Sequence, residues 1–176
     1  SFVLQVPQLV KETTPYNHIS LDWTPHGHTP EPVYNKPHFD MHFYMIDEPE
    51  KNSIDTTKPE LNILPDSFLL PTFYVPEPGG ISKMGKHWVD ITSPELNPVN
   101  PAPFTSTFIY GSYNGKVIFH EPMITRAFLL SKPDTVMNIR QPVGFARPGH
   151  YPTNYQIQFD NEKKQWRIIL RDFEHR

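Results

Sequence analysis

Short stretches of the chain alternate between apolar and polar residues, a period of two that predicts β-strands. The strongest alternation runs over residues 38–46, HFDMHFYMI. Successive side chains of a strand point to opposite faces. One face of this strand therefore carries metal-ligand types, His38, Asp40 and His42, and its back carries a hydrophobic stripe. Further strands are predicted at residues 19–23 and at residues 1–10, the latter broken by Pro7.

A hairpin is predicted around Asn114-Gly115, between two runs rich in β-branched and aromatic residues. Asn-Gly is the pair favoured in two-residue turns, because both central residues need a positive φ. In the strand after the turn we expect Val117, Phe119 and Glu121 to share the inward face. Ile118 and His120 would then point the opposite way.

A second hairpin is predicted from strands at residues 155–160 and 165–172, joined around residues 160–163. Its inward side chains would be Tyr155, Ile157 and Phe159, opposite Trp166, Ile168 and Leu170. Between the hairpins, residues 123–130 are predicted to form one or two helical turns, with Thr125 as the cap and Pro133 as the stop.

Proline is the compositional outlier, with 21 prolines against 8 glycines in 176 residues. Because proline is excluded from helix interiors and central strands, long helices are not expected. Residues 24–37 and 47–62 are predicted to be loops. The expected fold is a single mostly β domain over residues 1–176, an antiparallel sandwich or small barrel with Pro-rich loops and little helix.

Charge and motifs exclude several classes of protein. The formal net charge is −3, so the chain is not basic, as a nucleic-acid binder usually is. No apolar run approaches the length of a membrane span. Cysteine is absent, so disulfides, iron–sulfur clusters and thiol nucleophiles are excluded. The chain also has no Gly-rich phosphate loop, no Gly-x-Ser-x-Gly and no His-Glu-x-x-His. A small-molecule ligand and a homo-oligomer both stay open as partners.

Nine histidines are many for this length, and four of them, His26, His28, His38 and His42, lie within residues 26–42. Imidazole and carboxylate groups are the usual ligands of Zn, Mn, Fe or Ni where thiolates are absent. A polar rim without metal is the simpler alternative. Residues four apart on a straight strand are separated by about 13 Å, so His38 and His42 cannot bind the same ion unless the strand bulges or the segment becomes helical. Asp40 lies within reach of either histidine.

Glu121 and His87 extend this set. A carboxylate on an inward face is costly without a partner. A metal ion, Arg126, or a position at the surface would each explain Glu121. A single histidine beside a tryptophan, as His87 is beside Trp88, is more often part of the core or rim than a ligand.

Several of these segments resemble an uncharacterised bacterial family, of the kind under extracytoplasmic stress sigma-factor control in a Thermus relative. The first block combines Leu21-Asp22-Trp23, Gly27-His28-Thr29-Pro30, Tyr34 and the run Pro37 to Tyr44, PHFDMHFY. Later blocks are residues 84–90, 107–111 and 121–125. The resemblance implies a β-rich, often exported domain of unknown biochemical function. It supports His28, His38, His42, His87 and Glu121 as metal-site positions, and His26 is less typical of the pattern.

The sequence thus predicts an exported domain that binds one divalent metal, zinc first and Mn, Fe or Ni as alternatives, through a subset of those five residues. A start at Ser1 rather than Met favours a protein whose signal peptide was removed, and hence a periplasmic or extracellular location. One alternative is a cupin-like metal-dependent oxidoreductase or hydrolase, although the His and Gly spacing does not match a cupin. The other is a carbohydrate-binding module without metal.

Overall fold

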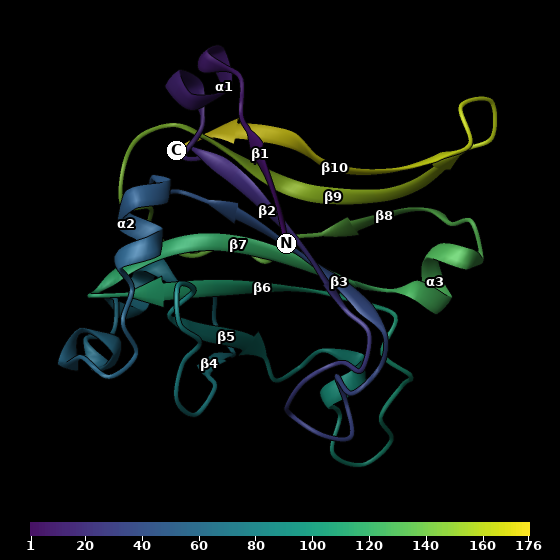
Figure 1. Cartoon of the computed structure of the whole chain (residues 1–176), viewed down its shortest axis with the longest axis horizontal. Coiled ribbons are helices and arrows are strands. Elements are labelled where there is room, and N and C mark those ends of the chain that lie inside the picture. The colour runs from purple at the N-terminus through teal and green to yellow at the C-terminus, as the bar shows by residue number, and fades with distance from the viewer.

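The computed structural model describes residues 1–176 as two antiparallel sheets that face each other (Figure 1). Strands hold 41% of the residues and helices 15%, which confirms a mostly β fold with little helix. The arrangement is sandwich-like, and the sheets do not close into a barrel.

The larger sheet has seven strands in the order β1-β2-β3-β7-β6-β5-β4. Their bounds are β1 Phe2–Gln5, β2 His18–Thr24, β3 His38–Tyr44, β7 Lys116–Thr125, β6 Ser106–Tyr113, β5 Lys86–Asp90 and β4 Tyr74–Pro76. The smaller sheet has the order β10-β9-β8. Its strands are β10 Gln165–His175, β9 His150–Asp160 and β8 Asp134–Asn138.

Both faces of the larger sheet are covered at its centre. Between the sheets, Phe108, Tyr110 and Ile124 pack with Tyr155 and Ile157 of the smaller sheet. The opposite face lies beneath loops, where two further apolar clusters form around Tyr34 with Phe104 and around Tyr44 with Phe119. Because three strands face seven, part of the inner face has no partner sheet.

Three short helices connect the strands: α1 Gln8–Thr13, α2 Glu48–Ser53 and α3 Arg126–Leu130, with single 3₁₀ turns at Pro59–Asn62, Ser67–Leu69 and Pro94–Leu96. None of the helices combines the length and the apolar character needed to span a membrane. The first strand ends before Pro7 as expected, but the helix α1 that follows it was not predicted. The prediction of a plain loop over residues 47–62 is wrong, because α2 starts there, with the Asp47 side chain accepting a 2.8 Å hydrogen bond from the Glu50 amide.

Helix α3 is shorter than predicted. Met123 and Ile124 belong to strand β7, and the helix begins only at Arg126. Thr125 caps it as predicted, since its hydroxyl accepts a hydrogen bond from the Phe128 amide at 3.2 Å.

The hairpin of β6 and β7 is confirmed, with positive φ at Asn114 and Gly115. The expected side-chain phase is wrong at its start, because the register shifts at Gly111 and Ser112. Beyond this bulge, Phe119 and Glu121 share a face, whereas Val117 packs against the cluster between the sheets. An extra residue in one strand inverts the alternation, and no local sequence signal marks it.

The second hairpin is also confirmed. Trp166 lies opposite Phe159, Ile168 opposite Ile157, and Leu170 opposite Tyr155, as predicted from the alternation. Both strands are longer than expected, and the pairing continues to His150 and His175.

Candidate functional site

The polar face of strand β3 is its buried face. The side chains His38, Asp40 and His42 belong to residues that are 0%, 6% and 1% exposed, whereas Phe39 and Met41 on the back are only half-buried. The loop of residues 25–37 covers the polar side, and its Tyr34 is fully buried there. Histidine and aspartate are rarely buried without partners. The buried polar side chains of β3 therefore need partners inside the protein.

We call His42, His87 and Glu121 the inner group. Antiparallel pairing places β3 beside β7, and β5 beside β6, so that these three side chains converge on one face. Nε2 of His42 lies 3.4 Å from Oε2 of Glu121, and Nε2 of His87 lies 3.6 Å from the same oxygen. Metal–ligand bonds of 2.0–2.2 Å at tetrahedral angles place two ligand atoms about 3.4 Å apart. The spacing of the inner group therefore suits a small divalent ion.

The inner group contains buried polar atoms that no protein group satisfies. Both ring nitrogens of His42 and Oε2 of Glu121 are buried and have no hydrogen-bond partner. The nearest group behind His42 is Asp22, whose Oδ2 lies 3.5 Å from Nδ1. Nearly all buried polar atoms in native proteins are paired. A cation between Nε2 and Oε2 would satisfy both atoms at once.

The electrostatics of the inner group depend on burial. Burial raises the pKa of Glu121 to about 8 and lowers the pKa of His87 to about 3. Burial also disfavours charge on His42, but the negative charges of Glu121 and Asp22 outweigh it and raise the pKa of this imidazole. The His87 nitrogen thus keeps its lone pair at neutral pH. A bound cation would favour the carboxylate form of Glu121.

Phe119 supports the two histidines of the inner group. Its ring centroid lies 4.9 Å from that of His42 and 5.2 Å from that of His87. The ring occupies the space above Gly111 of β6, where an added Cβ would lie 2.0 Å from the ring carbons. Only glycine at position 111 leaves room for this packing.

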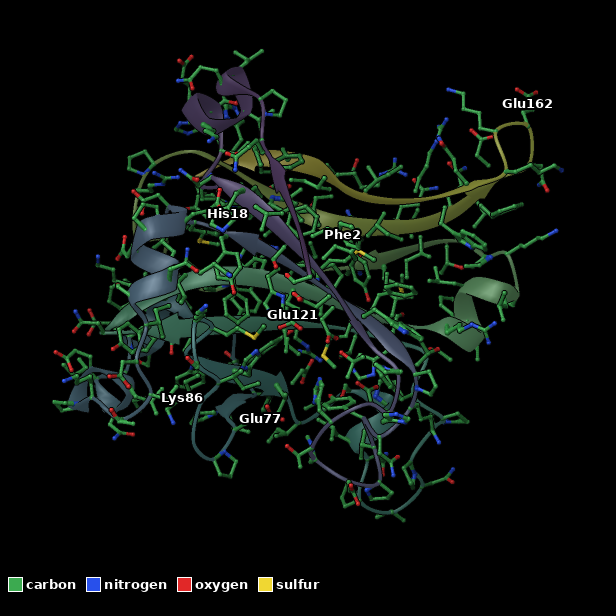
Figure 2. All side chains as sticks on the ribbon, in the orientation of Figure 1. Phe2, His18, Glu77, Lys86, Glu121 and Glu162 are labelled. Atoms are coloured by element: carbon green, nitrogen blue, oxygen red, sulfur yellow. The ribbon has the colours of Figure 1, made fainter.

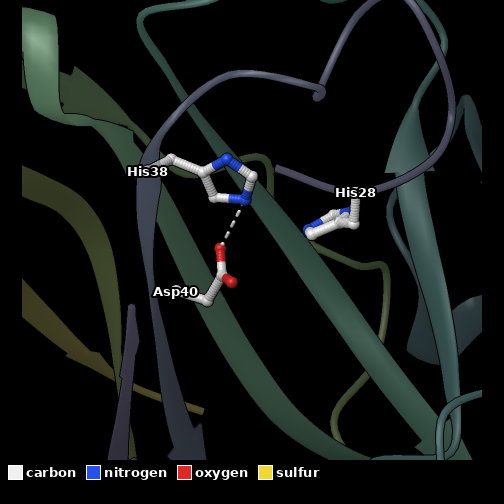
Figure 3. A group of neighbouring side chains, drawn as sticks. All are labelled: His28, His38 and Asp40. Atoms are coloured by element: carbon white, nitrogen blue, oxygen red, sulfur yellow. Dashed lines mark ion pairs between the residues drawn. The ribbon is translucent and has the colours of Figure 1, made fainter. Parts of the chain in front are cut away.

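The second cluster, which we call the outer group, consists of His28, His38 and Asp40 (Figure 3). Nδ1 of His38 lies 2.6 Å from the Lys36 carbonyl, and Nδ1 of His28 lies 2.6 Å from the Thr29 carbonyl. In each ring Nδ1–H donates to the carbonyl. A neutral ring so oriented presents its Nε2 lone pair to a ligand position.

His38 and Asp40 are in close contact within the outer group. Nε2 of His38 lies 3.0 Å from Oδ1 of Asp40, but neither atom makes a hydrogen bond of acceptable geometry. Burial opposes charge on both groups. Their mutual attraction is stronger, so it raises the pKa of His38 and lowers the pKa of Asp40. The pair can exist as imidazolium and carboxylate, or hold a cation together with His28.

One pocket borders both groups. It has a volume of about 560 Å³, and its lining includes His28 of the outer group, His87 of the inner group, and Glu77. Burial raises the pKa of Glu77 to about 7. Figure 2 places Glu121 in the middle of the molecule and Glu77 below it, beside strands β4 and β5. A small molecule in this pocket would meet one imidazole from each group.

The structure thus divides the five predicted residues into two sets. His42, His87 and Glu121 converge, and His28 and His38 lie together with Asp40. His38 and His42 are in different sets, as the strand spacing predicts.

The remaining predicted partners lie outside both groups. His26 is exposed, and His120 points to the opposite face, where its Nδ1 lies 2.7 Å from the Tyr16 hydroxyl. Arg126 does not pair with Glu121, so that explanation of the buried carboxylate is wrong. Asp22 and Glu77 were not identified from sequence. Asp22 could have been, since it alternates with apolar residues on β2.

Comparison with protein-family models, with curated proteins and with solved structures yields no match for this chain. The two groups and the pocket beside them are therefore the features of this chain that bear on its function.

Proposed function

We propose that this protein binds a divalent metal ion at the inner group, with His42, His87 and Glu121 as ligands. The observation that carries the proposal is the set of buried, unpaired ligand atoms at tetrahedral spacing, His42 Nε2 and Glu121 Oε2 above all. Without a cation or another partner, these atoms would remain unsatisfied inside the protein, at a cost of about 1–3 kcal/mol each.

Zinc is the ion that suits this donor set best. Two imidazoles and one carboxylate form a set common in zinc sites, and such sites with three protein ligands keep a fourth position for water or substrate. Manganese, iron and nickel accept the same nitrogen and oxygen donors. Asp22 would orient His42 from behind, the usual role of a carboxylate next to a ligating histidine.

The outer group extends the proposal to a second ion, held by Nε2 of His28, Nε2 of His38 and a carboxylate oxygen of Asp40. His28 is the most accessible of these three residues. The ion at the outer group would therefore exchange more readily than the ion at the inner group. We also propose, on the family resemblance, that the protein carries out this function outside the cytoplasm.

A second candidate function is metal-dependent catalysis, a hydrolysis or an oxidation of a small molecule. It is favoured by the pocket of about 560 Å³, which His87 and His28 both line. Two measurements test it: the metal content of the protein by elemental analysis, and its turnover of a panel of ester and phosphoester substrates. Turnover that needs metal and disappears in His87→Ala would support catalysis, and no turnover on any substrate would favour metal binding alone.

The deciding experiment measures metal content. Protein stripped with EDTA is dialysed against Zn, Mn, Fe and Ni ions in turn and analysed for bound metal per chain. We expect stoichiometric zinc in the wild type and at least about 100-fold weaker binding at the inner group in His42→Ala. His120→Ala is the matched control, because His120 is also buried and next to Glu121 but points to the opposite face, toward Tyr16. A wild type that binds none of these ions would refute the proposal.

The same measurement separates the two groups. His42→Ala should remove one ion and His38→Ala the other, so that each variant keeps one site. If His38→Ala retains the full metal content of the wild type, only the inner group binds metal.

A further inference from the structure

An apolar groove lies on the opposite side of the larger sheet from both metal groups. Strands β1, β2 and β3 extend beyond the three-stranded sheet, and β10 faces them as the nearest strand. The groove between these edges has a volume of about 700 Å³, within the range of small-molecule sites. Helix α3 lies at one end of the sandwich (Figure 1) and contributes to the groove.

Eleven of the twelve residues that line this apolar groove are hydrophobic. Phe39 and Met41 of β3 form part of its floor, and Trp166 of β10 forms part of the facing wall. Trp23 and Trp166 are each more than two-fifths exposed, although both are large aromatic residues. A concave, mostly apolar surface with exposed tryptophans is typical of a site that binds an apolar ligand.

The twelfth lining residue is Arg126, which is the only charged one. Arg126 directly follows Thr125, and Thr125 pairs with His38, so the arginine lies near the Phe39 end of the groove. Its guanidinium makes no ion pair, and its side chain makes no hydrogen bond. The guanidinium group of an arginine commonly binds a carboxylate through two parallel N–H···O hydrogen bonds. One end of the groove thus offers an unused anion-binding group.

From this combination we infer that the groove binds a single-chain amphiphile with a carboxylate head group, a fatty acid in chemical class. The alkyl chain lies along β3 from Phe39 toward Phe43, a distance of about 13 Å along the strand. The carboxylate pairs with Arg126. Each buried methylene contributes favourably, so affinity increases with chain length.

A second copy of the chain is the competing occupant. It would need a protruding apolar element that also carries an acidic group to meet Arg126. A flexible alkyl carboxylate supplies both features in one molecule and fits a recess between two sheet edges. The inference is independent of the metal proposal, because the groove and the two groups lie on opposite faces of the sheet.

Tryptophan fluorescence provides a direct test. Of the three tryptophans, Trp23 and Trp166 line the groove. Trp88 is buried, and its Nε1–H donates a hydrogen bond to the Ser112 hydroxyl. Titration with 11-bromoundecanoate should quench the first two and leave Trp88 unquenched. We expect saturation at one ligand per chain, below the concentration at which the ligand forms micelles.

The head group is tested with dodecanoate, dodecanol and dodecyltrimethylammonium as competitors. Dodecanoate should displace the probe best. Arg126→Gln should weaken dodecanoate binding about tenfold and leave dodecanol unchanged, since a charge-assisted hydrogen bond contributes about 1.4 kcal/mol or more. Arg147→Gln, an arginine outside the groove, is the matched control.

Met41→Trp, which fills the groove, should weaken binding of every alkyl chain, and an unchanged far-UV circular dichroism spectrum would show that it is folded. Equal dodecanoate affinity in Arg126→Gln, or no saturable quenching, would overturn the inference. So would a wild-type dimer in sedimentation equilibrium that Met41→Trp dissociates, because a second copy would then occupy the groove.

Discussion

Asp22 lies behind His42, with its Oδ2 atom 3.5 Å from Nδ1 of that imidazole. Burial alone would raise the pKa of this carboxyl group, but its interaction with His42 outweighs burial and lowers the pKa to about 2. Asp22 is therefore charged at neutral pH. A charged partner 3.5 Å from Nδ1 favours the tautomer whose Nε2 lone pair faces Glu121.

We therefore expect Asp22→Asn to weaken zinc binding at the inner group by about 10- to 100-fold, the usual effect of removing a carboxylate behind a ligand histidine. Competition with a chromophoric chelator measures it. Asp160→Asn is the control, since Asp160 pairs with Arg167 in the distant hairpin. Equal affinity in Asp22→Asn and the wild type would show that Asp22 does not orient His42.

Glu121 predicts a pH dependence of the metal-free protein. Burial raises its pKa from an ordinary 4.5 to about 8, so between these values the folded protein binds more protons than the unfolded chain. The free energy of unfolding then falls as the pH rises. The pKa of His42 is also raised, because the charges of Glu121 and Asp22 outweigh burial. Above pH 6.5 this group therefore also makes the free energy of unfolding fall as the pH rises. His87, whose pKa burial lowers to about 3, acts oppositely only below 6.5.

The melting temperature of the EDTA-treated protein should therefore fall between pH 6.5 and 8. Glu121→Gln should flatten this slope, because an amide does not titrate. Saturating zinc should also reverse it, because the metal binds the deprotonated ligands. A slope that Glu121→Gln leaves unchanged would mean that another group titrates.

At the scale of elements, two glycines of one hairpin have separable roles. Gly111 makes room in β6 for Phe119, and an added Cβ would lie 2.0 Å from its ring. Gly115 forms the turn with φ at 73°, and an added Cβ there meets nothing closer than 3.4 Å. A side chain at position 111 would disturb the packing of Phe119 next to the inner group. A side chain at position 115 would strain the backbone of the turn alone.

We expect Gly111→Ala to cost about 1–3 kcal/mol of stability through overpacking and to weaken zinc binding as well, because Phe119 contacts both ligand histidines. Gly115→Ala should cost about 1–2 kcal/mol through its left-handed backbone and leave zinc affinity unchanged. Urea unfolding and zinc titration of both variants measure these effects. Equal loss of zinc affinity in both would contradict the separation.

The elements that sequence predicted correctly are those set by local patterns. The Asn114-Gly115 turn and the register of β9 with β10 depend on neighbours in the chain, and both are confirmed. The bulge that moves Val117 to the other face arises from pairing with Gly111 and Ser112, so alternation within one strand cannot reveal it. Helix α2 does carry a local signal, Asp47 followed by Pro49, which the polar composition of the segment obscured.

In the candidate site, too, local spacing predicts some of the arrangement, and the pairing of distant strands determines the rest. Strand geometry alone separates His38 from His42. It leaves Asp40 within reach of either histidine, and the structure groups Asp40 with His38. The convergence of His87 with Glu121 depends on the order β3-β7-β6-β5, which brings distant segments together. Arg126 directly follows β7, the strand that carries Glu121, and it lies on the groove face of the sheet. Residues five apart along a strand point to opposite faces, so the spacing already argues against that pairing.

Across the molecule, the two faces of the larger sheet differ in chemistry, polar beneath the 25–37 loop and apolar along the groove. Zinc at 100 times its dissociation constant should add about 2.7 kcal/mol to the free energy of unfolding. For a chain of this size the melting temperature would then rise by about 5–11 °C. Differential scanning calorimetry should show this rise in the wild type and in His120→Ala. A comparable rise in His42→Ala would place the stabilising ion outside the inner group.

The pairing of β3 with β7 also determines when the inner group can form during folding. Residues 45–115 separate the two strands, and His87 lies within that interval. Bringing such remote segments together requires closing a long loop of chain, which is slow and late in β proteins. Zinc should therefore stabilise contacts that form after the transition state. In stopped-flow kinetics we expect zinc to slow unfolding and to leave the refolding rate nearly unchanged.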